Sequence, residues 1–511
     1  MTGTSEPSPL ITQQDAPALE ALLGDPFAHG SITFADLIAN EDASRLTPAL
    51  RELWHAGEVG AELVPLDLGG RRTSAAGLVR RLRPIFRRDP SLGVDLVVAP
   101  LAVMTAAMSA GDDAQRRAVA ARVRSGATIG AVLTGSDPGS SAASIRLHRR
   151  GAGWIADGES SLVAGADAPD MWALPARIGD QTEALVLCET GDATPAPQIE
   201  TVGLRGTRFA AATVRSLAVD RSHVLGAQDS SHALARARIE TAAIVAALAI
   251  ATVDTAIRLA IPYASERRLY RGTVLEIPHA RSLLADAHTD LLIADVVASQ
   301  VVDGMDAGGL DELTASAGAY LVPLLLTDAM RGLSVLFGST FYARVEPYAV
   351  FETLLRDVGS LSLLGVGTPG ALDPIAAALR AWGDGALAFD DRNAGEPATP
   401  AAEALFQRRA GFGDRVRATD LADAAAARRL AHEAAILIAA GACDRFARTG
   451  PTVVAAEWRA AAHVRWDARL TGRQASLPES SIESAVDDLT SCVDDGISVT
   501  LERVPVFGRI P

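Results

Sequence analysis

The sequence predicts a mostly helical α+β protein in which a β-rich domain lies between helical domains. Residues 46–128 place apolar side chains at helical spacing, with arginines on the opposite face. Residues 129–229 consist of short apolar segments separated by Gly, Asp and Pro, a pattern typical of strands. From residue 230 onward long apolar helices return. This order of helices, strands and helices is the basis of the predicted fold.

Each domain has a predicted range. Residues 1–45 contain Pro, Ala and scattered acids, so we expect an extension with one or two short helices. Residues 46–128 form an N-terminal helical domain, and residues 129–229 form a small barrel or sandwich. Residues 230–380 form a domain of long helices, and residues 381–511 form an additional helical domain.

Strands are predicted where apolar residues cluster between turn residues, and long helices where they run on at helical spacing. The predicted strands are Ile129–Leu133, Ser144–His148, Trp154–Asp157, Met171–Ala176, Ala184–Leu187 and Ala212–Val219. The predicted long helices are Ala233–Arg271 (which contains Pro262), Pro278–Asp306, Leu310–Leu336, Leu421–Phe446 and Thr452–Leu470.

Composition narrows the classes of function. The chain has 511 residues and a formal net charge of −15, which argues against a nucleic-acid or anionic-membrane surface. The first residues do not resemble a signal peptide, and the longest apolar run, Ala242–Ala251, is too short to span a bilayer. Cys188, Cys443 and Cys492 are isolated and odd in number, which favours a reducing cytoplasm over a disulfide framework. The sequence suggests no metal-ligand cluster.

Several motifs occur in a fixed order along the chain. Residues 130–145 read Gly-Ala-Val-Leu-Thr-Gly-Ser-Asp-Pro-Gly-Ser-Ser-Ala-Ala-Ser-Ile, with Thr134, Gly139 and Ser140 in register with the signature T-E-P-x-x-G-S-D. The later motifs are Gly203-Leu204-Arg205-Gly206-Thr207, Tyr263-Ala264-Ser265-Glu266-Arg267, Phe337-Gly338 and Arg356-Asp357. In these motifs and their order the chain resembles the acyl-CoA dehydrogenase family over roughly residues 46–380.

The resemblance implies an N-terminal helical domain, a β-domain and a C-terminal four-helix bundle, with the bundle at residues 230–380. In that family an oxidised FAD accepts a hydride from Cβ of an acyl-CoA while a glutamate removes the Cα proton. It also implies a dimer or a dimer of dimers. The helices from Ala233 and from Leu310 are apolar on more than one face, and we expect a single copy to leave those faces exposed.

The resemblance also implies where a flavin cleft would lie. Thr134 corresponds to a hydroxyl donor to the flavin ring, and Ser140 to a position near the CoA moiety. Arg267 corresponds to an arginine that reaches the FAD pyrophosphate of a neighbouring subunit, since its planar fork of donors suits phosphate. The predicted cofactor-binding or vacated-cleft residues are Leu133, Thr134, Ser140, Leu162, Val163, Ala164, Arg267, Val335, Phe337 and Gly338.

The chain departs from the family at the residues that carry its chemistry. Aliphatic residues at 162–164 replace an aromatic and a hydroxyl donor, and Val335 replaces a glutamine. Where the family places its glutamate, just before a Gly-Thr pair, the chain reads Leu-Gly-Val-Gly-Thr at 364–368. Some family members place the base at the position of Thr241; its neighbour Glu240 lies about 100 degrees away around a helix and is a weak candidate.

Three functions remain open from the sequence. The first is a repurposed enzyme that cyclises or isomerises a large apolar acyl or polyketide-type substrate, with FAD weakly bound or lost. The second is an FAD enzyme, either an acyl-CoA or acyl-carrier dehydrogenase with Glu240 as base or a flavin monooxygenase. The third is a non-catalytic partner of an active paralogue. We expect the first, because the base and the flavin contacts are lost together.

Overall fold

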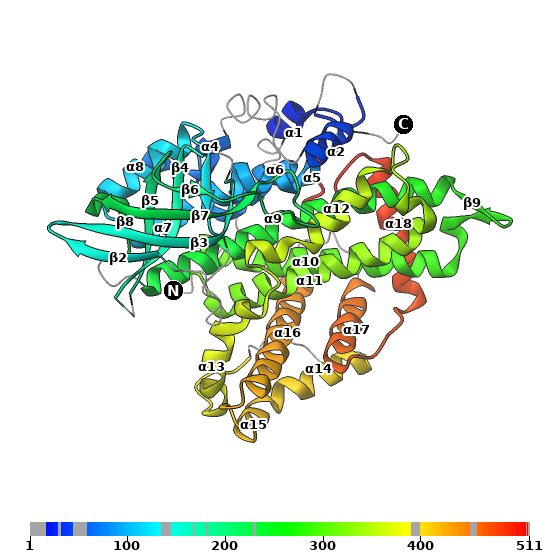
Figure 1. The fold of residues 1–511 in the computed structure, drawn as a ribbon. Coiled ribbons are helices and arrows are strands. Elements are labelled where there is room, and N and C mark those ends of the chain that lie inside the picture. Colours follow the sequence, from blue (N-terminus) through cyan, green and yellow to red (C-terminus); the bar gives the residue numbers. More distant parts are fainter. Residues whose placement is uncertain are drawn as a thin grey trace, which may run out of the picture.

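The computed structural model shows a helical protein with a β-domain at one end and long helices running away from it (Figure 1). A second group of helices, α13 to α17, lies beside the middle of the long helices (Figure 1). The structure describes residues 17–28, 32–43, 59–133, 145–166, 169–179, 182–227, 231–389, 399–449, 457–506 and 508. The predicted fold class is confirmed.

The N-terminal helices pack against the start of the β-domain and against the long helices. Helix α5 is the largest of them and begins where the Ser74 hydroxyl accepts a hydrogen bond from the Gly77 amide. The predicted apolar face of α5 is buried, and so are three arginines of the same helix, Arg83, Arg87 and Arg88. The helices are α1 (Pro17–Leu23), α2 (Phe34–Ala43), α4 (Val59–Leu63), α5 (Ala75–Arg88), α6 (Pro90–Gly93), α7 (Ala99–Ala110) and α8 (Asp113–Arg124).

The β-domain is one mixed sheet with the strand order β6-β7-β3-β1-β4-β5-β8, and β2 pairs with β3 and β4. Its own apolar core contains Trp172 and Val163. The predicted strand Trp154–Asp157 is part of a longer strand that runs through the polar residues Glu159 and Ser160 to Ala164, paired with β7. The strands are β1 (Ile129–Ala131), β2 (Ile145–Arg150), β3 (Gly153–Ala164), β4 (Met171–Ile178), β5 (Thr182–Glu189), β6 (Thr194–Pro195), β7 (Phe209–Val219) and β8 (Val224–Leu225).

Three long helices form the centre of the molecule. Helix α9 (Ser231–Glu266) starts beside the β-domain and ends at a hairpin of β9 (Arg268–Leu269) and β10 (Gly272–Thr273) at the far end (Figure 1). Helices α10 (Pro278–Asp306) and α11 (Glu312–Phe337) pack along it. Helix α12 (Val350–Gly359) follows α11, and α13 (Asp373–Gly383) leads into the second group of helices.

The additional helical region consists of α14 (Pro400–Ala410), α15 (Phe412–Arg417), α16 (Ala424–Thr449), α17 (Glu457–Thr471) and α18 (Glu479–Asp494). Its last part returns to the main body, because α18 packs along α10. Residues 497–504 then enter a buried contact with α5, α9 and α10, which we call the tail seam. The region predicted as an additional domain at 381–511 therefore contacts the long helices through α18 and residues 497–504.

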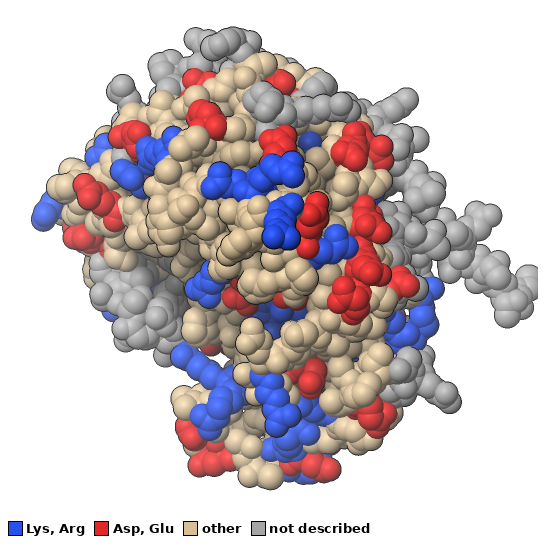
Figure 2. Space-filling model, turned by 90° about the vertical axis from the view of Figure 1, so that its right-hand side faces the viewer, with Lys and Arg blue, Asp and Glu red and all other residues tan. Residues whose placement is uncertain are grey.

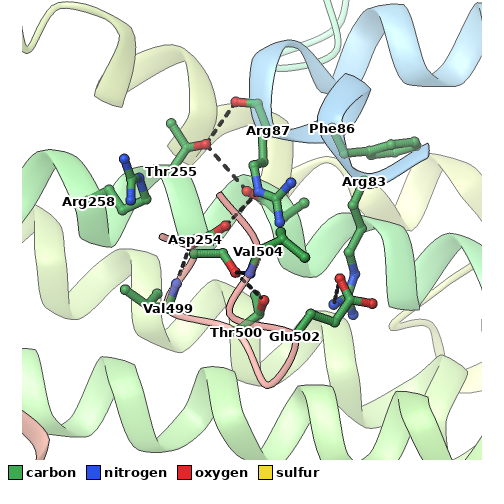
Figure 3. A network of polar contacts seen from close by, with 12 residues as sticks. Arg83, Phe86, Arg87, Asp254, Thr255, Arg258, Val499, Thr500, Glu502 and Val504 are labelled. Atoms are coloured by element: carbon green, nitrogen blue, oxygen red, sulfur yellow. Dashed lines mark hydrogen bonds and ion pairs between the residues drawn. The ribbon is translucent and has the colours of Figure 1, made fainter. Parts of the chain in front are cut away.

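Buried ion pairs hold the tail seam together (Figure 3). Arg87 of α5 donates to Asp254 of α9 at 2.7 Å, and Asp254 accepts from the Val499 amide at 2.9 Å. In the same way Arg83 donates to Asp295 of α10, which accepts from the Leu501 amide at 2.8 Å. Each carboxylate thus meets a guanidinium and a backbone amide, so its buried charge is compensated.

The long apolar helices are buried by the chain itself. Three helical segments, Pro90–Ala110, Ser231–Glu266 and Glu312–Tyr342, are long and apolar enough to cross a membrane by length and composition. Their most apolar windows are 83%, 89% and 56% buried within the protein. The expectation that one copy leaves the apolar faces of α9 exposed is therefore wrong, since other elements of the same chain cover them. The three cysteines are free and buried.

Candidate functional site

The loop between α12 and α13 lacks the carboxylate that the family resemblance implies. Val366 lies just before Gly367 and Thr368, and its side chain is fully buried in the main apolar core. Gly367 has a φ of +68°, which favours glycine, and its amide donates to the Ala319 carbonyl of α11 at 2.8 Å. The loop therefore keeps a defined backbone against α11 but presents an aliphatic side chain where the base would be.

Glu240 lies in the first half of α9 and is half-buried. It projects from the first half of α9 toward Arg72, and burial raises the pKa of its carboxyl while the charge of Arg72 opposes that shift. Its neighbour Thr241 is buried and donates its hydroxyl to the Ala237 carbonyl at 2.9 Å within the helix. Neither residue lines any of the three cavities described below. Glu240 is therefore a half-buried carboxyl with the positive charges of Arg72 and Arg236 nearby.

The predicted cleft residues of the β-domain lie on the sheet. Val163 and Ala164 are buried at the end of β3, where Ala164 faces Ala131 of β1. Leu133 and Leu162 are half-buried and pack against the main apolar core. These side chains offer no hydrogen-bond donor. Thr134 and Ser140, which would complete this side of the cleft, lie outside the described residues.

The remaining predicted residues lie at the far end of α9. Tyr263 donates its hydroxyl to the carbonyl of Phe337 at 3.0 Å, which joins the ends of α9 and α11. Phe337 is buried, whereas Val335 is 59% exposed. Arg267 lines an open cavity of about 880 Å³, together with Tyr263, Glu266, Ser339, Thr340, Ala343, Val345, Glu346 and Tyr348. Gly338 adjoins this cavity with a φ of +54°.

One chain does not bring the two groups of predicted residues together. Helix α9 has 36 residues, and at a rise of about 1.5 Å per residue it spans about 54 Å. The β-domain lies at its start and Arg267 follows its end (Figure 1). A site that uses Leu162 and Arg267 at once would need a second copy of the chain.

The described residues fit FAD poorly. The β-domain side presents aliphatic groups to a ring whose nitrogens and oxygens need donors, and an unpaired buried polar group is costly. At the other end Arg267 is accompanied in its cavity by two acids, Glu266 and Glu346, which would repel a pyrophosphate. Arg267, Ser339 and Thr340 could still donate to phosphate oxygens. The flavin-dependent steps of the family are therefore not assigned to this chain.

A second cavity adjoins the Arg356-Asp357 motif. It has a volume of about 810 Å³ and is lined by Gln198, Glu200, Thr201, Val202, Arg205, Arg344, Glu352 and Arg356. The motif itself is structural: Asp357 accepts from the Leu204 amide, and Arg356 donates to Glu352 and to the Val202 carbonyl. Burial raises the pKa of Asp357 well above its usual range. The described residues contain no group of His, Cys, Asp and Glu arranged to hold a metal ion.

Comparisons with known proteins identify the fold. The model for the acyl-CoA dehydrogenase C-terminal domain matches residues 225–372. An acyl-CoA dehydrogenase complexed with FAD from Bacillus anthracis aligns with a TM-score of 0.75 and 14% identity, covering 98% of this chain and 97% of that one. The chain has the acyl-CoA dehydrogenase fold, and its residues 225–372 match the C-terminal domain of that family. At this identity the structural likeness establishes the fold and not the reaction.

Shorter members of the fold family align with most of this chain. Butyryl-CoA dehydrogenase from Megasphaera elsdenii has a TM-score of 0.63 and 14% identity, covering 73% of this chain and 99% of that one. A probable acyl-CoA dehydrogenase from Mycobacterium abscessus has a TM-score of 0.60 and 18% identity, covering 69% of this chain and 93% of that one. No curated protein matches at the level of sequence.

The sequence did not reveal the tail seam. Its charged residues are spread over 83–502, and single arginines and aspartates on helices are normally solvent-exposed. One signal was available: Asp254 and Asp295 each stand alone in an otherwise apolar stretch of a long helix. A lone carboxylate in such a stretch indicates a buried partner, because an unpaired buried charge is strongly unfavourable.

Proposed function

We propose that the protein is an enzyme of the acyl-CoA dehydrogenase fold that no longer removes an α-proton through a glutamate. Its substrate would be a large apolar acyl or polyketide-type molecule, and its reaction a cyclisation or an isomerisation. One observation carries the proposal: Val366, buried in the core, stands where the family resemblance implies the base. The sequence has no Asp or Glu from 358 to 372.

A cyclisation or isomerisation suits a site without a strong base or a cofactor. Such reactions can be promoted by holding the reacting atoms of one molecule in a productive geometry. The half-buried Leu133 and Leu162 offer an apolar wall at the predicted cleft, and small-molecule sites are usually apolar with few polar groups. The acid or base that would assist is not assigned.

The experiment that tests this function compares the purified protein with the reaction of the family. We expect no flavin absorption and no turnover of straight-chain acyl-CoAs with an electron acceptor, since loss of a general base costs about 10²–10⁴-fold in rate. A yellow protein that turns over such a substrate at ordinary rates would instead establish the FAD enzyme. If turnover is seen, Glu240→Gln separates the two options: loss of rate identifies Glu240 as the base.

A bulky substitution tests the apolar wall once a substrate is in hand. Leu162→Trp should suppress binding while the melting temperature stays nearly unchanged, because Leu162 is half-buried. Ala164→Trp is a poorer probe, because Ala164 is 2% exposed and a large side chain there would overpack the sheet. Unchanged binding by Leu162→Trp, measured by calorimetry, would place the substrate elsewhere.

A non-catalytic role beside a second chain is the other candidate. The end of the molecule around Arg267 exposes apolar side chains: Leu269 at 40%, Tyr270 at 100%, Val335 at 59%, Tyr342 at 85% and Val345 at 54%. Figure 2 looks onto this end, where basic and acidic side chains are interspersed with broad uncharged surface. Such a surface favours contact with another protein chain, so we propose an oligomer; light scattering that shows a monomer would contradict it.

A further inference from the structure

A separate cavity lies where the N-terminal helices meet the second half of α9. It has a volume of about 850 Å³, part of which is open to solvent. Residues of α1, α2, α5, α9 and α18 line it, together with Val506 and Gly508. Much of its wall is apolar: Pro26, Phe27, Phe34, Leu259, Pro262, Val493 and Val506.

Arg87 brings a buried donor to the wall of this cavity. The residue is 4% exposed, and it forms ion pairs with Asp254 at 2.7 Å and with Glu20 at 3.5 Å. Those contacts use Nε and Nη1, while Nη2 is buried and has no hydrogen-bond partner. A buried donor without a partner is unfavourable, so a ligand oxygen in the cavity would remove that cost.

Arg258 adds a positive charge that no carboxylate within ion-pair distance compensates in the described part of the chain. It lies one turn beyond Asp254 on α9, on the side of the helix that carries Thr255 (Figure 3). Its guanidinium donates to the Ile497 carbonyl at 2.5 Å. Burial lowers its pKa; the charge of Asp254 opposes that shift, and the charge of Arg87 adds to it. A bound anion would favour the charged form of Arg258.

Arg88 forms part of the wall. Its guanidinium donates to the carbonyls of Leu23, Gly24 and Ile32, and it lies over the ring of Phe34 at 5.8 Å. These contacts fix the N-terminal segment over the cavity. Two acids, Glu20 and Asp494, also reach the wall, so the site suits one negative charge better than two.

We propose that this cavity binds an apolar monocarboxylate of the medium-chain fatty acid class. The carboxylate would accept from Nη2 of Arg87 and from Arg258, because guanidinium donors match its planar oxygens. The hydrocarbon chain would lie among Phe27, Leu259 and Val493. None of the described residues predicted for the flavin cleft lines this cavity, so the proposal does not depend on the function proposed above.

Calorimetry with fatty carboxylates tests the proposal on the full-length protein. We expect a saturable site for one member of the series from octanoate to dodecanoate, and at least about tenfold weaker binding of the matching uncharged alcohol. Arg258→Gln should weaken binding of the carboxylate by about 10- to 100-fold, as expected for loss of one charge-assisted hydrogen bond. Arg331→Gln, at a 73% exposed arginine on α11, is the matched control and should bind like the unaltered protein.

A second variant guards against a folding defect in Arg258→Gln. Val493→Glu places a carboxylate in the cavity wall on α18 and should also abolish binding, while melting curves of all variants stay close together. A crystal structure with a terminally brominated carboxylate should show bromine among the apolar residues. The proposal is wrong if no member of the series binds, if the alcohol binds equally, or if Arg258→Gln binds unchanged.

Discussion

The tail seam contains buried charged side chains, whereas the loop around the equally buried Val366 contains none. The seam keeps Arg83, Arg87, Asp254 and Asp295 at 0–4% exposure and satisfies the carboxylates with guanidinium and amide donors. The loop is equally buried at Val366 but has no charged group from 358 to 372. Buried charge in this molecule joins distant segments at the seam, whereas the loop at 358–372 is packed without any charged side chain.

The largest effect should come from breaking the seam. Asp254→Ala removes the partner of a buried arginine and the acceptor of the Val499 amide, so we expect a loss of about 3–5 kcal/mol in unfolding free energy. Urea denaturation measures it. The double variant Arg87→Met/Asp254→Leu removes both charges and should recover much of the loss. A loss below about 1 kcal/mol in Asp254→Ala would show that the pair is unimportant.

Placing a carboxylate in the loop tests the other half of the comparison. Val366→Glu puts a carboxyl at a fully buried position, and a pKa raised there by about 3 units corresponds to about 4 kcal/mol at neutral pH. Because the folded pKa is raised, the part of the loss that comes from ionisation should be absent below about pH 4 and grow as the pH rises, while burial of the neutral carboxyl costs stability at every pH.

Denaturation at several pH values checks the stability of Val366→Glu, with Val366→Leu as the apolar control. Under the proposed function we also expect no dehydrogenase activity, since Leu162, Val163 and Ala164 offer no side-chain donor to a flavin. FAD-dependent turnover by Val366→Glu would contradict this and show that only the base had been lost.

His288, which lies beside the tail seam, should make the free energy of unfolding depend on pH. It is 3% exposed on α10, and burial lowers its pKa to about 4 although Asp488 lies 3.3 Å away. A depressed folded pKa gives stability that is complete above about pH 6.5 and is lost as the pH falls toward 4, by up to about 3 kcal/mol. His288→Gln should flatten the stability profile over that range. An unchanged slope would mean that another group titrates there.

A surface ion pair provides the smallest expected effect. Arg122 of α8 and Glu189 of β5 form a pair whose side chains are 43% and 50% exposed. Arg122→Gln should change the unfolding free energy by less than about 1 kcal/mol, because solvent already screens this charge. The same denaturation assay measures this change. A loss as large as that of Asp254→Ala would show that the exposed pair stabilises the protein as much as the buried pair.

The sequence predicts local features of this fold better than its distant contacts. Helix α10 occupies the predicted Pro278–Asp306, because apolar periodicity and Pro278 at its start are local signals. The sequence predicts only Trp154–Asp157 of strand β3; pairing with β7 carries the strand on through Glu159 and Ser160 to Ala164. The arginines of α5 were predicted on the face opposite the apolar one, and the structure buries three of them.

The candidate site was predictable only in part. The missing carboxylate before Gly367 could be seen from the residue order alone. The separation of Leu162 from Arg267 could not, because it depends on the full length of α9. The cavity at Arg258 was also missed, since its lining residues come from segments between 20 and 508 and carry no motif.

The tail seam can form only late in the synthesis of the chain. Val499 leaves the ribosome 245 residues after Asp254, which at about 5–20 residues per second is a delay of about 10 to 50 s. During that time residues 497–504 do not yet cover helices α5, α9 and α10, and Asp254 and Asp295 lack their amide donors. The contacts of α5, α9 and α10 with residues 497–504 are therefore missing from the nascent chain until those residues have been synthesised.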